Sequence, residues 1–120
     1  MLLNYHSNGR FLFSLLLVGQ PELLSSITRI PQLRQRIHIN YHLLPLNQLE
    51  TYNYVLHRLK FAESKREVFS LSALKEVYHQ SKGVPRVINT ICDLSMLAAF
   101  LTKHDLVERE DVLNILELMA

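Results

Sequence analysis

The chain has 120 residues, of which 48% are hydrophobic and 20% are charged, and its formal net charge is +2. This length suits one domain with its own hydrophobic core. The Lys and Arg residues are scattered and do not form the basic patch that tight binding to duplex DNA or RNA needs, so we expect no nucleic-acid partner. A single cysteine, Cys92, excludes an internal disulfide and favours a reducing compartment, so we expect a cytoplasmic protein. No apolar run approaches the length of a membrane span of about 20 residues.

The first part of the chain is predicted to be a fragment of an α/β sheet. Residues 1–8 are expected to end a helix. The apolar run at 11–18 predicts a strand that is buried on both faces of a parallel sheet. Short helices are predicted over 23–30 and 32–35, each behind a proline. Apolar and polar residues alternate from 37 to 43, which predicts a second, parallel strand.

After Pro45 every segment is predicted to be helical. Asn47 caps a helix that runs to about Phe61, and Glu50 completes a capping box. Further helices are predicted over 71–80, over 85–103 and from about 108 onward, with Asp111 in the first turn of the last one. The predicted fold class is therefore an α/β fragment at 1–45 followed by a four-helix module at 46–120.

Two strands do not complete a sheet. A strand as apolar as 11–18 needs neighbours on both edges and helices on both faces, and the chain supplies too few of them. The mean hydropathy of +0.07 also indicates apolar surface intended for something absent. We therefore expect a truncated domain, or a sheet whose missing strands come from another chain.

The segment 81–89 places an arginine at the start of a helix. Gly83 supplies the left-handed residue that ends one helix, and Pro85 suits the first turn of the next. Arg86 then lies where unpaired N–H groups and the helix dipole disfavour a cation by about 0.3 to 1 kcal/mol. A bound phosphate would reverse that sign, because helix N-termini and guanidinium groups both bind phosphate oxygens. The alternative is that Arg86 pairs with an Asp or Glu or lies in solvent.

The order of four landmarks resembles the AAA+ ATPase domain of the general secretion pathway protein A family and, more distantly, helper ATPases of transposition. The landmarks are a strand leading into 17–23, then 33–37, 41–46 and 83–89. The resemblance implies the last strands of a P-loop AAA+ parallel sheet followed by a helical lid, with ATP as cofactor. It also implies partners: neighbouring AAA+ subunits in a homo-oligomer, and the proteins of a secretion or pilus machine. The location it implies is cytoplasmic, with contact to the inner membrane only through other parts of the parent protein.

The same resemblance assigns roles to individual residues. Gln20 matches the sensor of the γ-phosphate, Arg36 or Arg34 matches the finger that reaches a neighbouring subunit's nucleotide, and Arg86, with Gly83 and Pro85, matches the lid sensor. Gln20 would lie at the carboxyl end of a strand, where open α/β sheets bind ligands, although a simple helix N-cap would explain it too. Arg36 could stabilise the charge on a transferring phosphoryl group, or it could be an ordinary surface arginine.

The chain also departs from the family pattern. No G-x-x-x-x-G-K-[ST] motif occurs, and no acidic pair follows a hydrophobic strand, so the ligands of Mg²⁺ must lie outside this chain and it should not hydrolyse ATP alone. No metal site is expected, because His38 and His42 would lie about 13 Å apart on a strand. The alternative function is a stand-alone helical interaction or adaptor domain, associated with DNA transposition, that performs no nucleotide chemistry.

Overall fold

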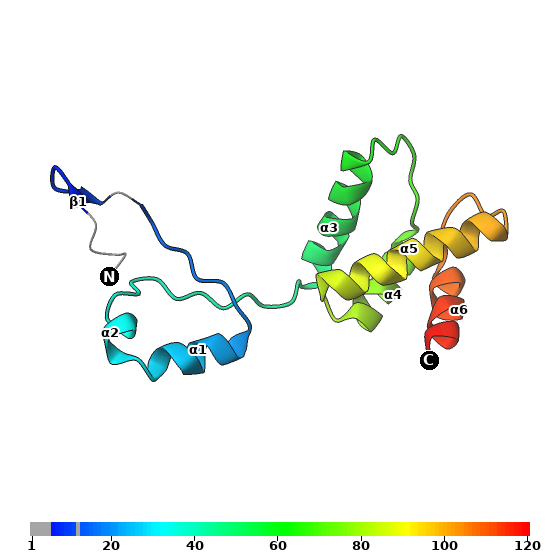
Figure 1. Ribbon diagram of the computed structural model, residues 1–120. Coiled ribbons are helices and arrows are strands. Elements are labelled where there is room, and N and C mark those ends of the chain that lie inside the picture. Colours follow the sequence, from blue (N-terminus) through cyan, green and yellow to red (C-terminus); the bar gives the residue numbers. More distant parts are fainter. Residues whose placement is uncertain (1–5, 12) are drawn as a thin grey trace. The chain divides into compact units, whose positions relative to one another are not determined.

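The computed structural model describes residues 6–11 and 13–120. Contacts divide the chain into two units, Met1–His42 and Leu43–Ala120. The assignment of 1–45 and 46–120 to two AAA+ subdomains stays a prediction. The elements shown in Figure 1 are, in chain order, β1 (His6–Ser7), β2 (Arg10–Phe11), α1 (Pro21–Thr28), α2 (Pro31–Arg34), α3 (Gln48–Phe61), α4 (Leu71–Ser81), α5 (Pro85–Leu101) and α6 (Arg109–Met119).

The predicted parallel sheet is wrong. Among the described residues the only sheet is the antiparallel hairpin β1–β2, and the only parallel pairing is an isolated bridge between Phe69 and Val107. Residues 13–20 and 37–43 have no regular secondary structure, and Leu16 is 83% exposed. The physical reason is that the chain supplies too few strands to pair with these two segments. A strand without a neighbour leaves its N–H and C=O groups to water, and the apolar side chains of a lone strand cannot bury each other.

The helix expected to end within 1–8 lies partly outside the described residues, and β1 stands at its end instead. Both short helices of the first unit are confirmed, as α1 and α2, and each has a proline in its first turn. Neither helix contains a buried residue. The first unit therefore has local structure without a core of its own among its described residues.

All four helices predicted after Pro45 are confirmed in the second unit. The capping box of α3 is present, because Glu50 donates its N–H to Asn47 Oδ1 at 2.9 Å and Asn47 donates its N–H to Glu50 Oε2 at 2.8 Å. The N-cap of α6 is similar, with Asp111 accepting from the Glu108 N–H at 2.9 Å. Helix α4 is capped by the Ser70 hydroxyl. Three of the four helices thus begin with a side chain that accepts a hydrogen bond from one backbone N–H group at the helix start.

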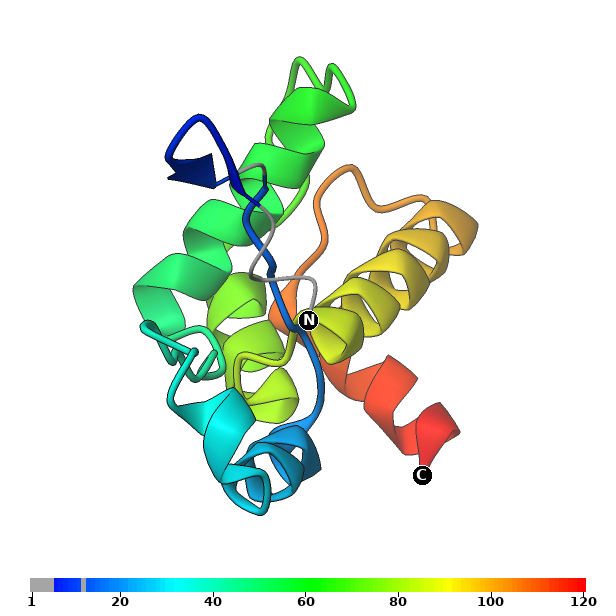
Figure 2. The ribbon, with the colours of Figure 1, turned by 60° about the vertical axis from the view of Figure 1, so that its left-hand side comes forward.

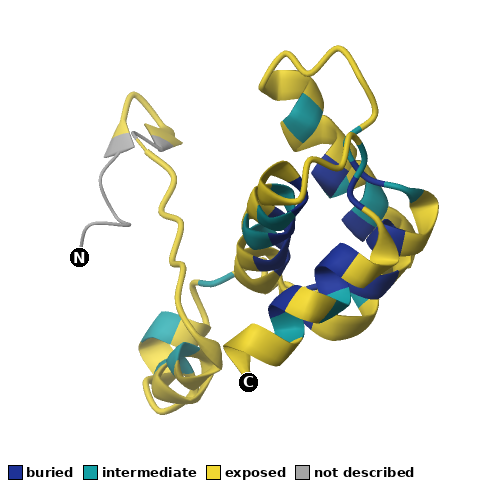
Figure 3. Cartoon of the chain, turned by 90° about the vertical axis from the view of Figure 1, so that its right-hand side faces the viewer, coloured by how far each residue is buried: buried dark blue, intermediate teal, exposed yellow. Residues whose placement is uncertain are grey.

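The core of the second unit lies where the apolar faces of the four helices meet. Helices α4 and α5 each contact the other three, as Figure 1 and Figure 2 both show. Figure 3 shows the buried positions on the facing sides of the helices. The buried hydrophobic side chains are Val55, Phe69, Ala73, Leu74, Val77, Ile88, Ile91, Cys92, Ala99, Val107, Val112 and Ile115. This packed unit positions the turn between α4 and α5.

Candidate functional site

The turn between α4 and α5 contains two consecutive left-handed residues. Lys82, with φ +50°, is the C-cap of α4 and donates its N–H to Tyr78 O at 2.9 Å. Gly83 follows with φ +76° and donates its N–H to Ser81 Oγ at 3.3 Å. The sequence predicted one left-handed residue here, Gly83, and the structure adds Lys82. Together they reverse the chain within a few residues, so that α5 begins close to the end of α4.

Gly83 is required at this turn by a close contact as well as by its φ. A Cβ at position 83 would lie 1.8 Å from the carbonyl oxygen of Leu46. Leu46 also donates its N–H to Gly83 O at 2.9 Å. The backbone that enters the second unit is therefore held directly against the turn before α5, at a distance that only glycine allows.

Helix α5 begins without a side-chain cap. Its N-cap is Val84, Pro85 stands in the first turn, and no acidic residue is present there. The first N–H to bond back is that of Ile88, which donates to Val84 O at 2.9 Å. The N–H groups of Arg86 and Val87 have no hydrogen-bond partner within the described part of the chain. Among the four helices of the second unit, α5 is the one whose described residues provide no side-chain cap or capping box at its N-terminus, where the positive end of the helix dipole lies.

Arg86 lies on this open first turn. Its side chain is exposed, and its guanidinium makes no hydrogen bond or ion pair to any described residue. Of the two local alternatives weighed above, pairing with a carboxylate is therefore not found between described residues, and the side chain extends into solvent. Gly83, Pro85 and Arg86 lie together in one turn, as the sequence pattern required.

The other predicted site residues lie in the first unit. Gln20 is the N-cap of α1, its side chain makes no cap hydrogen bond, and its carbonyl accepts from Leu23 N–H at 2.9 Å. Arg34 is in the last turn of α2 and is exposed. Arg36 follows the helix, is also exposed, and donates its backbone N–H to Leu33 O at 3.0 Å. The predicted strand end and helix-to-strand junction are absent at these positions, so their proposed chemistry rests on the family resemblance.

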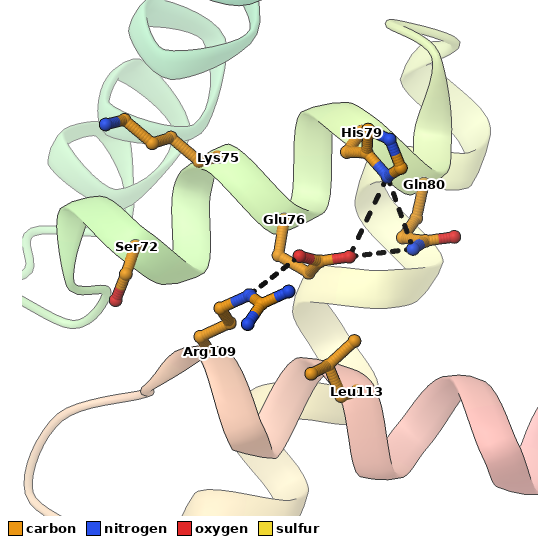
Figure 4. A pocket seen from close by; sticks show the side chains of 7 residues that line it. All are labelled: Ser72, Lys75, Glu76, His79, Gln80, Arg109 and Leu113. Carbon is orange, nitrogen blue, oxygen red and sulfur yellow. Dashed lines mark hydrogen bonds and ion pairs between the residues drawn. The ribbon is translucent and has the colours of Figure 1, made fainter.

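The structure also contains a polar cluster that the sequence patterns did not reveal. Glu76 on α4 is only 8% exposed, and its Oε2 accepts from Arg109 Nε on α6 at 3.0 Å. Its Oε1 accepts from Gln80 Nε2 at 2.7 Å, and His79 Nδ1 lies 3.9 Å away (Figure 4). The hydrogen bond from Gln80, followed by that from Arg109, lowers the pKa of Glu76.

This Glu76 cluster holds α4 against α6. It borders an open pocket of about 560 Å³, and in Figure 4 the Lys75 and Ser72 side chains point away from the carboxylate. Glu76 and Arg109 are 33 positions apart, so no local pattern could pair them. Glu76 shares its side of α4 with Ser72, His79 and Gln80, so the sequence pattern carried no signal that its carboxylate would be buried.

Cys92 is buried, as expected, and it is a free thiol. Burial raises the pKa of Cys92 to about 12, so the nucleophilic thiolate is scarce at neutral pH. Among the described residues no group of three or more His, Cys, Asp or Glu side chains could hold a metal ion. The helices that the structure describes include none long and apolar enough to cross a membrane.

Comparison with known proteins finds a relative that is named for a general secretion pathway. It is 39% identical over 102 residues to General secretion pathway protein A of Aeromonas hydrophila, and the match covers 83% of this chain. The chain is related to that family. The resemblance found in the sequence is thereby confirmed at the level of the family. The chain spans about a fifth of the length of this relative, since the match covers 19% of it. No family model and no solved structure matches the chain.

Proposed function

We propose that this chain is the sensor and lid segment of a P-loop ATPase of the AAA+ class that works in general secretion. The observation that supports it most is the start of α5. An exposed guanidinium stands there beside two open N–H groups and no first-turn carboxylate, and it has no hydrogen bond or ion pair with any described residue, so the turn is electrostatically suited to an anion. The relation to General secretion pathway protein A gives the biological setting.

In this proposal ATP is held with Mg²⁺ by residues that this chain lacks. The planar fork of Arg86 and the N–H groups of Arg86 and Val87 meet phosphate oxygens when the helical unit closes. Gly83 and Pro85 shape the turn that presents them. Binding of ATP then draws the four-helix unit toward the nucleotide, and loss of the γ-phosphate releases it, which couples hydrolysis to assembly of a secretion or pilus machine.

The first unit supplies two further roles under the same proposal. The Gln20 amide senses the γ-phosphate, because an amide can donate to a phosphate oxygen or orient a water molecule. Arg36 or Arg34 reaches the nucleotide of a neighbouring subunit in a homo-oligomer, where a cation stabilises the charge of the transferring phosphoryl group. The complex works on the cytoplasmic side of the inner membrane.

The test is a chimera. The 102 residues of the Aeromonas protein that match this chain are replaced by those of this chain, and Arg86→Ala is made in the product. ATP affinity, ATP turnover and melting temperature are measured on the same preparations. We expect affinity or turnover to fall about 10- to 100-fold, which corresponds to about 1.5 to 3 kcal/mol for a charge-assisted hydrogen bond. The melting temperature should not fall, because a cation has been removed from the positive end of a helix.

Lys60→Ala, which removes an exposed cation from the last turn of α3, is the matched control and should leave nucleotide binding unchanged. The 120-residue chain alone should show no Mg²⁺-dependent ATP hydrolysis above a mock purification. Unchanged ATP affinity and turnover in the Arg86→Ala chimera would contradict the proposal and favour a helical adaptor domain without nucleotide chemistry.

A further inference from the structure

The open pocket beside the Glu76 cluster lies between α4 and α6, and its lining includes no residue of the turn that carries Arg86. Its volume of about 560 Å³ falls within the range of about 300 to 1,000 Å³ that is usual for small-molecule sites. The side chains that line it are Ser72, Lys75, Glu76, His79, Gln80, Arg109 and Leu113 (Figure 4). We propose that this α4–α6 pocket binds a carboxylate, which is held by the guanidinium of Arg109.

Glu76 holds Arg109 in place through a single nitrogen. Arg109 Nε donates to Glu76 Oε2 at 3.0 Å, and Gln80 Nε2 donates to Oε1 at 2.7 Å, so each carboxylate oxygen already has a donor. The bond from Nε is the only hydrogen bond that the Arg109 side chain makes to a described residue, so its two terminal nitrogens keep their N–H groups for another acceptor. The Glu76 side chain is 9% exposed, whereas that of Arg109 is 59% exposed. A buried carboxylate thus fixes a guanidinium whose free edge faces water.

The free edge of this guanidinium selects the ligand chemistry. Two parallel N–H groups on one edge match the two oxygens of a planar carboxylate. Because Glu76 already orients Arg109, less side-chain freedom is lost when a ligand binds. Lys75 adds a positive field at the rim. It is exposed, has no hydrogen bond or ion pair with any described residue, and points away from Glu76 in Figure 4.

The remaining charges favour an anion with a single charge. Among the residues that line the pocket, Lys75 and Arg109 are cations and Glu76 is the one carboxylate, so one positive charge remains when His79 is neutral. A second carboxylate, that of Glu108, lies near the rim. A dianion such as phosphate is therefore less well matched than a monoanion.

Glu108 is occupied by contacts of its own. Ser72 Oγ donates to Glu108 Oε2 at 3.5 Å, and the Glu108 side chain accepts from the backbone N–H of Asp111 in the capping box of α6. Leu113 is half-buried and is the apolar member of the lining, so it can pack against carbon atoms next to the bound carboxylate. The ligand class is therefore a carboxylic acid with a short apolar part, which is either a free organic acid or the C-terminus of a polypeptide.

The experiment titrates the 120-residue chain, labelled with ¹⁵N, with two acids and their uncharged analogues, and follows the amide shifts of α4 and α6. The acids are 3-methylbutanoate and acetyl-Gly-Leu with a free carboxylate. The analogues are 3-methylbutanamide and acetyl-Gly-Leu-amide, and inorganic phosphate is titrated beside them. We expect both acids to shift residues around the pocket, more strongly at low salt, and both amides to shift none. Tighter binding of the dipeptide acid would indicate a polypeptide C-terminus as the source of the carboxylate, and the reverse order a free organic acid.

Two variants test the role of the guanidinium. Arg109→Lys keeps the charge beside Glu76 but loses the planar fork, and it should weaken both acids about 2- to 5-fold, the range for an exposed ion pair. Arg66→Lys, the same exchange at an exposed arginine in the loop before α4, is the matched control and should leave both affinities unchanged. Lys75→Gln changes an exposed side chain without a described partner, so it should leave the fold intact and weaken the acids about 2-fold.

Melting temperatures are measured on the same samples. Should Arg109→Lys lower the melting temperature, Lys75→Gln and the comparison of acids with amides still decide the question. Equal binding of acids and amides, tighter binding of phosphate than of both acids, or shifts confined to the start of α5 around Arg86 would overturn the proposal. The varied residues lie outside the turn that carries Arg86, so failure here would leave the nucleotide proposal as it stands.

Discussion

Gly83 occupies a position in the second unit that admits no larger side chain without strain. Its φ of +76° disfavours any L side chain, and a Cβ would lie 1.8 Å from Leu46 O. We expect Gly83→Ala to destabilise the unit by about 1 to 3 kcal/mol from backbone strain alone, and by more if Leu46 must move. Thermal unfolding followed by circular dichroism measures this.

The neighbouring position is the control for that prediction. Lys82 is also left-handed, with φ +50°, but it is exposed. Lys82→Gly relieves strain and should leave the melting temperature unchanged or higher. Equal melting temperatures for Gly83→Ala and the unmodified chain would mean that the turn can relax without cost.

Glu76 gives the second unit a defined dependence on pH. Hydrogen bonds from Gln80 and Arg109 lower the folded-state pKa of Glu76 below that of the unfolded chain. Its contribution to stability is therefore fully present above the ordinary glutamate pKa of about 4.3, and it is lost as the pH falls through the lower folded value. Urea midpoints measured from pH 6 down to pH 3 should fall for the unmodified chain.

Glu76→Gln should reduce the fall of the urea midpoint between pH 6 and pH 3. It should also lower the free energy of unfolding at pH 7 by about 1 to 2 kcal/mol, because a buried hydrogen-bonded charge is lost while Arg109, which is 59% exposed, is hydrated again. Glu117→Gln on the exposed side of α6 should leave the pH dependence of the urea midpoint unchanged. The same pH dependence in Glu76→Gln as in the unmodified chain would show that other carboxylates control acid unfolding.

At the scale of the element, the start of α5 has no side-chain cap, and a single substitution can supply one. Val84→Asp would place a carboxylate where it accepts from the N–H of Arg86 or Val87, and Val84 is already 39% exposed, so little packing is lost. We expect the unit to gain about 1 kcal/mol. If α5 binds a phosphate as proposed, the same change should lower the ATP affinity of the chimera, because the new carboxylate would occupy the position proposed for the phosphate.

Asn47→Ala removes the existing cap of α3 and serves as the reference for this gain. It should lower the free energy of unfolding by a similar amount. If Val84→Asp raises both stability and ATP affinity, the uncapped N-terminus has no role in nucleotide sensing.

The helices were predictable because each carries its own local signals. The helix ends are marked by Asn47 with Glu50 and by Gly83 with Pro85. Between such ends the apolar residues recur with the 3.6-residue period of a helix. The strands were not predictable, because an apolar run and an alternating run indicate a strand only when a neighbour exists, and pairing is a property of other residues. The position of Arg86 followed from local signals too. The contacts of Gly83 with Leu46 and of Glu76 with Arg109 join distant residues, so no pattern in either segment contained them.

At the scale of the whole molecule, stability should reside almost entirely in the second unit. Every described buried residue belongs to Leu43–Ala120, and none lies between positions 13 and 42. We expect residues 43–120 alone to fold cooperatively, with a melting temperature within about 4 °C of that of the full chain. Sedimentation should show less self-association, because exposed apolar side chains such as Leu16 and Val18 have been removed.

A fragment that melts more than about 8 °C below the full chain would show that residues 1–42 stabilise the second unit after all. Equal self-association of the fragment and the full chain would show that the associating surface lies on the helices, for example around the exposed Phe100 and Leu101.

The contact of Leu46 with Gly83 has a mechanical consequence. The hydrogen bond from Leu46 N–H to Gly83 O fastens the incoming chain to the turn three residues before Arg86. Tension applied to the chain from its N-terminal side would therefore be borne first by this bond and by the packing around it, and only later by the helices. We expect the turn that carries Arg86 to be displaced before the helices of the core separate. A pull on the chain ahead of Leu46 would thus reach the glycine turn before it reaches the helices.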